Sequence, residues 1–138
     1  MESFAEYGHA IASLGLFTLV VMIMSPISSL KKTGIDLPAG GTPENAYDDP
    51  VYRWNRAYLN ACETIGAFAA CTVAAILAGA DPFWVNLFAS VFLIARVLHA
   101  FVHIRGIGAM NMGPRTILYV LGWACCIGLS VLAIFAVL

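Results

Sequence analysis

Apolar residues fill four long stretches of the chain, separated by polar connections. The stretches cover residues 7–30, 53–80, 82–104 and 115–138. A helix that crosses a bilayer needs about 20 predominantly apolar residues, because each residue advances the helix by about 1.5 Å. All four stretches meet this length. The pattern therefore predicts an all-α membrane protein, a bundle of four transmembrane helices that forms one domain over residues 1–138.

The composition also indicates a chain that is surrounded by membrane lipids. Of the 138 residues, 61% are hydrophobic and 11% are charged, whereas a typical soluble domain has about 25% charged residues. A small soluble domain leaves much of its surface exposed and could not hide so much apolar area, so we expect membrane lipids around the chain. The net charge of -1 provides no basic field for a nucleic acid, and no nucleic-acid partner is expected.

The connections between the stretches differ in length and composition. Residues 31–52 are polar and rich in Gly, Pro and Asp, and residues 105–114 form a short Gly-containing loop. Asp81-Pro82 marks a tight turn, because proline favours the first turn of a helix. The first stretch is predicted to be a retained helix rather than a cleaved signal peptide, because acidic residues precede it and lysines follow it.

Basic residues mark one side of the predicted bundle. All seven Lys and Arg residues lie on the side of the loops 31–52 and 105–114, whereas the other side carries Glu2, Glu6 and Asp81. Cytoplasmic loops are enriched in Lys and Arg. We therefore expect an integral, multi-pass protein of a bacterial inner membrane, with both loops cytoplasmic and both termini on the non-cytoplasmic side.

Cysteine residues do not indicate a metal site. The four lie inside apolar stretches and form no Cys-x-x-Cys pair: Cys62, Cys71, Cys125 and Cys126. A zinc site or a disulfide framework normally shows such spacing. These residues are expected to pack between helices as small hydrophobic side chains, and no metal is expected.

Polar side chains line one face of the second predicted helix. Arg53, Arg56, Asn60 and Glu63 are spaced by three, four and three residues, which places them on the same side of an α-helix. Polar groups inside a membrane are costly and by default indicate a functional site. At 1.5 Å per residue, Glu63 would lie about 15 Å beyond Arg53, near the middle of the bilayer.

The third predicted helix carries a matching stripe. Arg96, His99 and His103 are again spaced by three and four residues. Counted from the loop 105–114, the helical rise places Arg96 near the depth of Glu63 and His99 near that of Asn60. The two helices are therefore expected to bring these side chains together.

The fourth predicted helix adds Arg115 and, one turn later, Tyr119. The expected pocket is net positive, because Arg56, Arg96 and Arg115 outnumber Glu63. Guanidinium groups bind carboxylates through two hydrogen bonds. The pocket suits a small polyanion that also offers an ammonium group to Glu63.

Structural interpretations of the same residues stay open. A Glu63–Arg96 ion pair could lock the bundle, and Arg53, Arg105 and Arg115 could anchor helices at the headgroups. A transporter or channel subunit is a third possibility, although the polar stripes are confined to one half of the membrane. The agreement in depth between three helices favours a binding site.

Three segments resemble one protein family. They are Arg53-Trp54-Asn55-Arg56-Ala57-Tyr58-Leu59-Asn60-Ala61-Cys62-Glu63-Thr64, Ala95-Arg96-Val97-Leu98-His99, and Pro114-Arg115-Thr116 with Tyr119. Together they are similar to the superfamily of membrane-associated proteins in eicosanoid and glutathione metabolism, and to its bacterial glutathione transferase-like members. The resemblance implies a homotrimer of four-helix bundles, with glutathione bound between subunits near the cytoplasmic side.

The resemblance also implies roles for individual residues. The positions that would bind glutathione are Arg56, Asn60, Glu63, His99, His103 and Tyr119. Glu63 would meet the ammonium of the γ-glutamyl group, and Arg53 and Arg96 would support the cluster. Arg115 would be catalytic, because a nearby cation stabilises a thiolate.

Two positions depart from the family pattern. His103 stands where many catalytic members carry Tyr, and no arginine ends the first helix, where Lys31 or Lys32 is a candidate substitute. The resemblance implies a glutathione transferase or peroxidase, with glutathione as co-substrate, that acts on lipophilic electrophiles or lipid hydroperoxides from the bilayer. A non-catalytic scaffold that binds a lipid or a thiol is the alternative.

Overall fold

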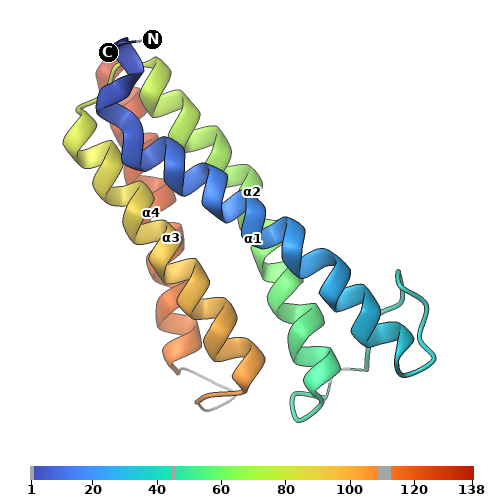
Figure 1. The fold of residues 1–138 in the computed structure, drawn as a ribbon. Coiled ribbons are helices and arrows are strands. Elements are labelled where there is room, and N and C mark those ends of the chain that lie inside the picture. The colour runs from blue at the N-terminus through green and yellow to red at the C-terminus, as the bar shows by residue number, and fades with distance from the viewer. Residues whose placement is uncertain (1, 45, 109–112) are drawn as a thin grey trace.

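The computed structural model describes residues 2–44, 46–108 and 113–138, and this part of the chain contains helices and no strand. A short 3-10 helix, η1 (Glu2–Tyr7), leads into α1 (Gly8–Thr33), which is followed by α2 (Pro50–Leu77), α3 (Pro82–Arg105) and α4 (Pro114–Val137). All four α-helices are long and apolar enough to cross a membrane. The structure confirms the predicted all-α class with four membrane-spanning helices (Figure 1).

Helix α2 begins and ends three residues earlier than predicted, and its caps explain the shift. The Asp49 carboxylate accepts hydrogen bonds from the backbone amides of Val51 and Tyr52, and Pro50 occupies the first helical position, where its missing amide hydrogen is not needed. At the other end, Gly79 adopts a φ of 69°. This left-handed conformation favours glycine and ends the helix.

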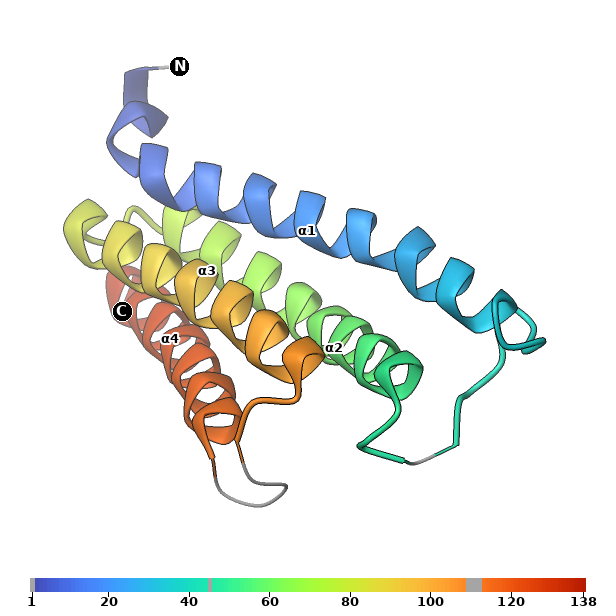
Figure 2. The same cartoon turned by 60° about the horizontal axis from the view of Figure 1, so that its bottom comes forward.

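The four α-helices are arranged in three layers. α2 and α3 pack against each other, α1 packs on both of them, and α4 also packs on both, from the opposite side (Figure 2). Both termini lie at one end of the bundle, here called the terminal end (Figure 1). The last turns of α1 and α3 and the first turns of α2 and α4 lie at the other, the loop end, as an even number of spans requires.

Three phenylalanines form the centre of the core. Phe68 and Phe92 stack with their ring centroids 3.8 Å apart, and Phe17 meets the ring of Phe92 edge-on at 5.1 Å. All three side chains are fully buried. Aromatic pairs in such geometries contribute attraction beyond the burial of their surface, so this cluster joins α1, α2 and α3 at mid-length.

Candidate functional site

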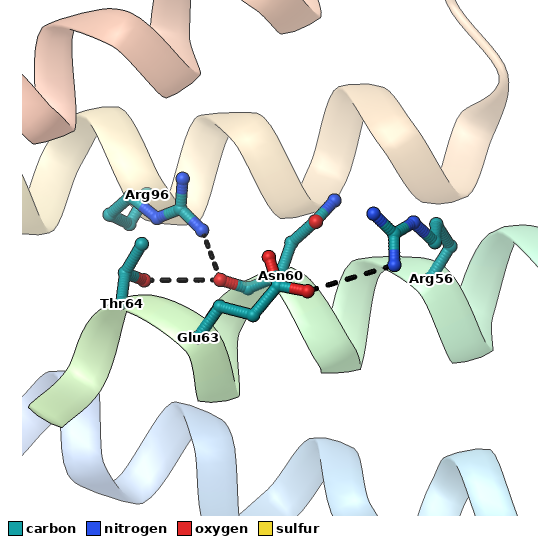
Figure 3. A network of polar contacts seen from close by, with 5 residues as sticks. All are labelled: Arg56, Asn60, Glu63, Thr64 and Arg96. Carbon is teal, nitrogen blue, oxygen red and sulfur yellow. Dashed lines mark hydrogen bonds and ion pairs between the residues drawn. The ribbon is translucent and has the colours of Figure 1, made fainter.

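The polar stripe of α2 divides between two surfaces of the helix. Arg56 and Glu63 form an ion pair, with 3.7 Å between Nη1 and Oε1, and their side chains are 42% and 48% exposed. Asn60, which lies between them in the sequence, is buried against α3 (Figure 3). The stripe therefore presents charge on an open face of the helix and an amide to the interior.

Arg96 enters the interior from α3 and is buried almost completely. Its Nη2 donates a hydrogen bond of 2.6 Å to the backbone oxygen of Asn60, which also accepts one from Thr64 Oγ1 at 3.1 Å (Figure 3). The guanidinium carbon lies 5.0 Å from the centroid of the Tyr119 ring. The Glu63–Arg96 pair considered above does not form in this chain, because Glu63 pairs with Arg56 and Arg96 reaches the Asn60 backbone.

Helix α4 approaches Arg96 closely because residue 122 is glycine. A Cβ atom at Gly122 would lie 2.8 Å from Cδ of Arg96, a distance at which one of the two must move. The glycine thus leaves room for the arginine side chain between α3 and α4. Within the described part of the chain, Nε and Nη1 of Arg96 have no hydrogen-bond partner, so two donors of a buried cation remain available.

Two buried histidines continue the cluster toward the loop end. The rings of His99 and His103 meet edge-on with centroids 5.6 Å apart, and His99 lies 5.7 Å from Tyr119. Both histidines are buried. Neither ring nitrogen of His103 has a hydrogen-bond partner among residues 2–44, 46–108 and 113–138. The structure thus places His99 of α3 beside Tyr119 of α4.

Tyr47 is a member of this cluster that sequence reasoning missed. Its ring centroid lies 5.9 Å from that of His103, and the guanidinium carbon of Arg115 lies 4.5 Å from the centre of the same ring. Tyr47 stands in a connection without a recognisable motif. The only available signal was Asp49-Pro50, which marks the start of α2 and places residue 47 just outside the helix.

Arg53 ties this connection to two helices. Its Nη1 donates to the backbone oxygens of Tyr47 and Asp48, both at 2.9 Å, and its Nε donates to the Ile104 oxygen at 3.1 Å. One guanidinium thus joins the first turn of α2, the connection and the last turn of α3. Arg53 therefore holds the connection against the ends of both helices.

The two lysines at the end of α1 each contact their own chain. Lys31 Nζ lies 5.3 Å from the centre of the Trp54 ring. Lys32 is buried and donates a hydrogen bond of 3.2 Å to the Gly41 oxygen. Both candidate substitutes for the missing arginine are thus held against residues of their own chain.

The assembled cluster has the donor set of an anion site. It combines guanidinium groups, imidazoles and phenols with one carboxylate, Glu63, on the adjacent face of α2. In the described residues, no group of three or more His, Cys, Asp or Glu side chains is placed to hold a metal ion. The arrangement therefore offers hydrogen bonds and positive charge to a ligand.

Comparison with known proteins identifies the family. A search of curated proteins finds no match. The model of the MAPEG family matches residues 8–135, which include all four membrane-spanning helices. Members of this family include glutathione transferases and related membrane proteins, and they generally bind glutathione and form trimers. With nearly its whole length matched, the chain belongs to the MAPEG family, as the motifs in α2, α3 and α4 indicated.

Proposed function

We propose that the protein binds glutathione between subunits of a homotrimer, near the cytoplasmic side of the membrane, and activates its thiol. The observation that carries this proposal is the Arg56–Glu63 ion pair on an open face of α2, next to the buried cluster around Arg96. Charged side chains inside a membrane almost always face protein or water rather than lipid. Something other than lipid, such as protein or a polar ligand, must therefore cover the charged side chains on the open face of α2.

The rest of that face supports a second copy of the chain as part of the cover. Beyond Glu63, the exposed positions of α2 include Gly66, Ala70 and Ala74. A Cβ atom at Gly66 would meet nothing within 4 Å in its own chain, so packing within one subunit does not explain this glycine. Small residues at this spacing let membrane helices approach closely, which favours an α2 interface in the trimer.

Glutathione matches the charges that meet there. It has two carboxylates, one ammonium group and one thiol. Glu63 accepts hydrogen bonds from the ammonium group, and Arg56 binds a carboxylate. The remaining contacts come from Asn60, His99, His103 and Tyr119, while Arg53 and Arg96 hold these side chains in position through their bonds to backbone oxygens.

Arg115 is the proposed catalytic residue, because a cation beside a thiol lowers the pKa of that thiol and favours the nucleophilic thiolate. The thiolate sulfur attacks an electrophilic carbon of a lipophilic substrate that enters from the bilayer. A C–S bond forms, the leaving group departs with its electron pair, and the thiol proton passes to water. Holding both reactants together also removes the entropic cost of their encounter.

The same thiolate can reduce a lipid hydroperoxide. The sulfur attacks the terminal oxygen, the O–O bond breaks and the lipid alcohol leaves. A second glutathione then reduces the sulfenic acid, which yields the glutathione disulfide and water. Both reactions need the same site, so the proposal covers a transferase and a peroxidase.

A non-catalytic protein that binds a lipid or a thiol is the second candidate. Two observations favour it: His103 replaces the tyrosine of many catalytic members, and Lys32, a candidate for the missing arginine, is buried and bonded to Gly41. Binding without thiolate formation would distinguish this candidate from the enzyme.

The test is a titration of the detergent-purified protein with glutathione, in which binding heat and thiolate absorbance are recorded together. Binding with thiolate formation supports the enzyme, and binding without it supports the scaffold. If no binding occurs, and Glu63→Gln behaves as the wild type, the proposal that the protein binds glutathione is wrong.

A further inference from the structure

The hydroxyl group of Tyr47 is buried and lacks a hydrogen-bond partner in residues 2–44, 46–108 and 113–138. Tyrosine hydroxyls that leave water usually find a partner, because an unpaired buried polar group costs free energy. An apolar ring of the same shape, that of phenylalanine, would fill this place without that cost. The unpaired hydroxyl therefore needs an explanation beyond packing.

The backbone around Tyr47 is held from both sides. Arg53 Nη1 binds the backbone oxygens of Tyr47 and Asp48, and its Nε binds the Ile104 oxygen at the end of α3. Two residues after Tyr47, Asp49 caps α2. These contacts fix the ring over the loop end of the cluster, although it belongs to a connection between helices.

One neighbour of the ring, His103, also has unused hydrogen-bonding capacity. The His103 ring, 5.9 Å away, is buried with neither nitrogen paired in the described residues. On the α4 side, the Arg115 guanidinium stacks on the Tyr47 ring at 4.5 Å, where the ring attracts the cation. Unpaired polar atoms beside a guanidinium suit a ligand that is anionic and rich in acceptors.

Resting on the function proposed above, we propose that Tyr47 is a further glutathione-contacting residue of this site. Its hydroxyl donates a hydrogen bond to the bound tripeptide, and its ring positions the Arg115 guanidinium for the thiol. Residues 47–49, at the end of the α1–α2 connection, are thereby part of the binding site and cover its loop end.

Two variants of Tyr47 separate the hydroxyl from the ring. Tyr47→Phe removes the hydroxyl alone, and we expect the affinity for glutathione to fall about tenfold, with an unchanged melting temperature, since one hydrogen bond to the ligand is lost. Tyr47→Leu also removes the aromatic face, and we expect the pKa of the bound thiol to rise toward that of free glutathione. Thiolate absorbance measured against pH reports this second effect.

Tyr52→Phe is the matched control, because Tyr52 lies in the first turn of α2 and its hydroxyl is not among the buried unpaired atoms. Its affinity for glutathione should equal that of the wild type. If the wild type binds glutathione and Tyr47→Phe binds it equally well, the role of Tyr47 is wrong while the proposed function stands. If the wild type does not bind, both are overturned. Should Tyr47→Leu fail to fold, Tyr47→Phe still decides the question.

Discussion

The two ends of the bundle treat buried polar groups in opposite ways. At the terminal end, the Tyr7 hydroxyl donates a hydrogen bond of 2.6 Å to the Ala80 oxygen. Nearby, Asn86 donates to the Glu6 oxygen at 2.6 Å and accepts from the Ala10 amide at 2.9 Å. These side chains bind backbone groups where η1, α1, α3 and the α2–α3 turn meet. This end is built for a stable, closed fold.

At the loop end, the same kinds of groups remain unpaired. Among the described residues, four side chains have buried atoms without a partner. Those of Tyr47, Arg96 and His103 belong to the cluster that opens to the loop end, whereas the Thr72 hydroxyl lies in the other half of α2. Unpaired polar atoms lower stability, and sites of function are where such a cost is tolerated. The contrast indicates that the loop end is shaped for a ligand that supplies the missing partners.

The largest expected effect on stability comes from the aromatic centre. Phe68→Ala removes a fully buried ring that stacks on Phe92 at 3.8 Å, and we expect it to lower the free energy of unfolding by about 3–5 kcal/mol. Phe135→Ala is the control, since Phe135 is 74% exposed and should change little. Chemical unfolding in detergent micelles measures both. A small loss of unfolding free energy in Phe68→Ala would show that the aromatic cluster is not the main stabilising part of the core.

The largest expected effect on binding comes from Glu63→Gln. The neutral amide cannot pair with the ammonium group of glutathione, and we expect the affinity to fall about 100-fold. Calorimetric titration measures the affinity. Glu6→Gln at the terminal end is the control, because only the backbone oxygen of Glu6 bonds to Asn86. Equal losses in the two variants would contradict a site confined to the loop end.

A third change tests the open face of α2. Gly66→Leu places a large side chain where the chain itself has nothing within 4 Å. If this face packs on another subunit, the side chain overfills the interface, and we expect the association constant to fall about tenfold. Gly15→Leu is the control, because Gly15 on α1 is equally open but has the large exposed side chains of Ile11 and Leu19 one turn away instead of small ones. Light scattering in detergent reports the oligomeric state, and an unchanged oligomer would argue against an α2 interface.

The fold followed from the sequence more fully than the site did. Apolar stretches of helical length define the spans with little ambiguity, since lipid requires every backbone group to bond within its own helix. The boundaries of α2 shifted because the Asp49 cap and Gly79 set its ends. Spacing also placed Arg56, Asn60 and Glu63 on one side of α2. It could not show that Asn60 turns inward while the two charges stay on the open face, since this depends on how α3 packs.

Two contacts were beyond sequence reasoning for a physical reason. Arg96 binds the backbone oxygen of Asn60 rather than the Glu63 carboxylate. Every residue has a backbone oxygen, so the sequence does not show which of them accepts a hydrogen bond from a side chain. Tyr47 reaches His103 and Arg115 from an irregular connection. The path of such a segment depends on single contacts, here those of Arg53, and not on a repeating pattern.

The smallest expected effect comes from replacing tyrosine by phenylalanine once at each end of the molecule. Tyr7→Phe removes a hydroxyl bonded to the Ala80 oxygen and leaves that oxygen without this donor, so we expect a loss of about 1 kcal/mol in the free energy of unfolding. Tyr47→Phe removes a hydroxyl that has no partner in the described chain, so the ligand-free protein should lose no stability.

Unfolding of both variants with and without glutathione completes the comparison. Glutathione should stabilise Tyr7→Phe as much as the wild type and Tyr47→Phe less, because only the second variant lacks a group that the ligand uses. Equal stabilisation of both would mean that the unpaired hydroxyl at the loop end is not kept for the ligand.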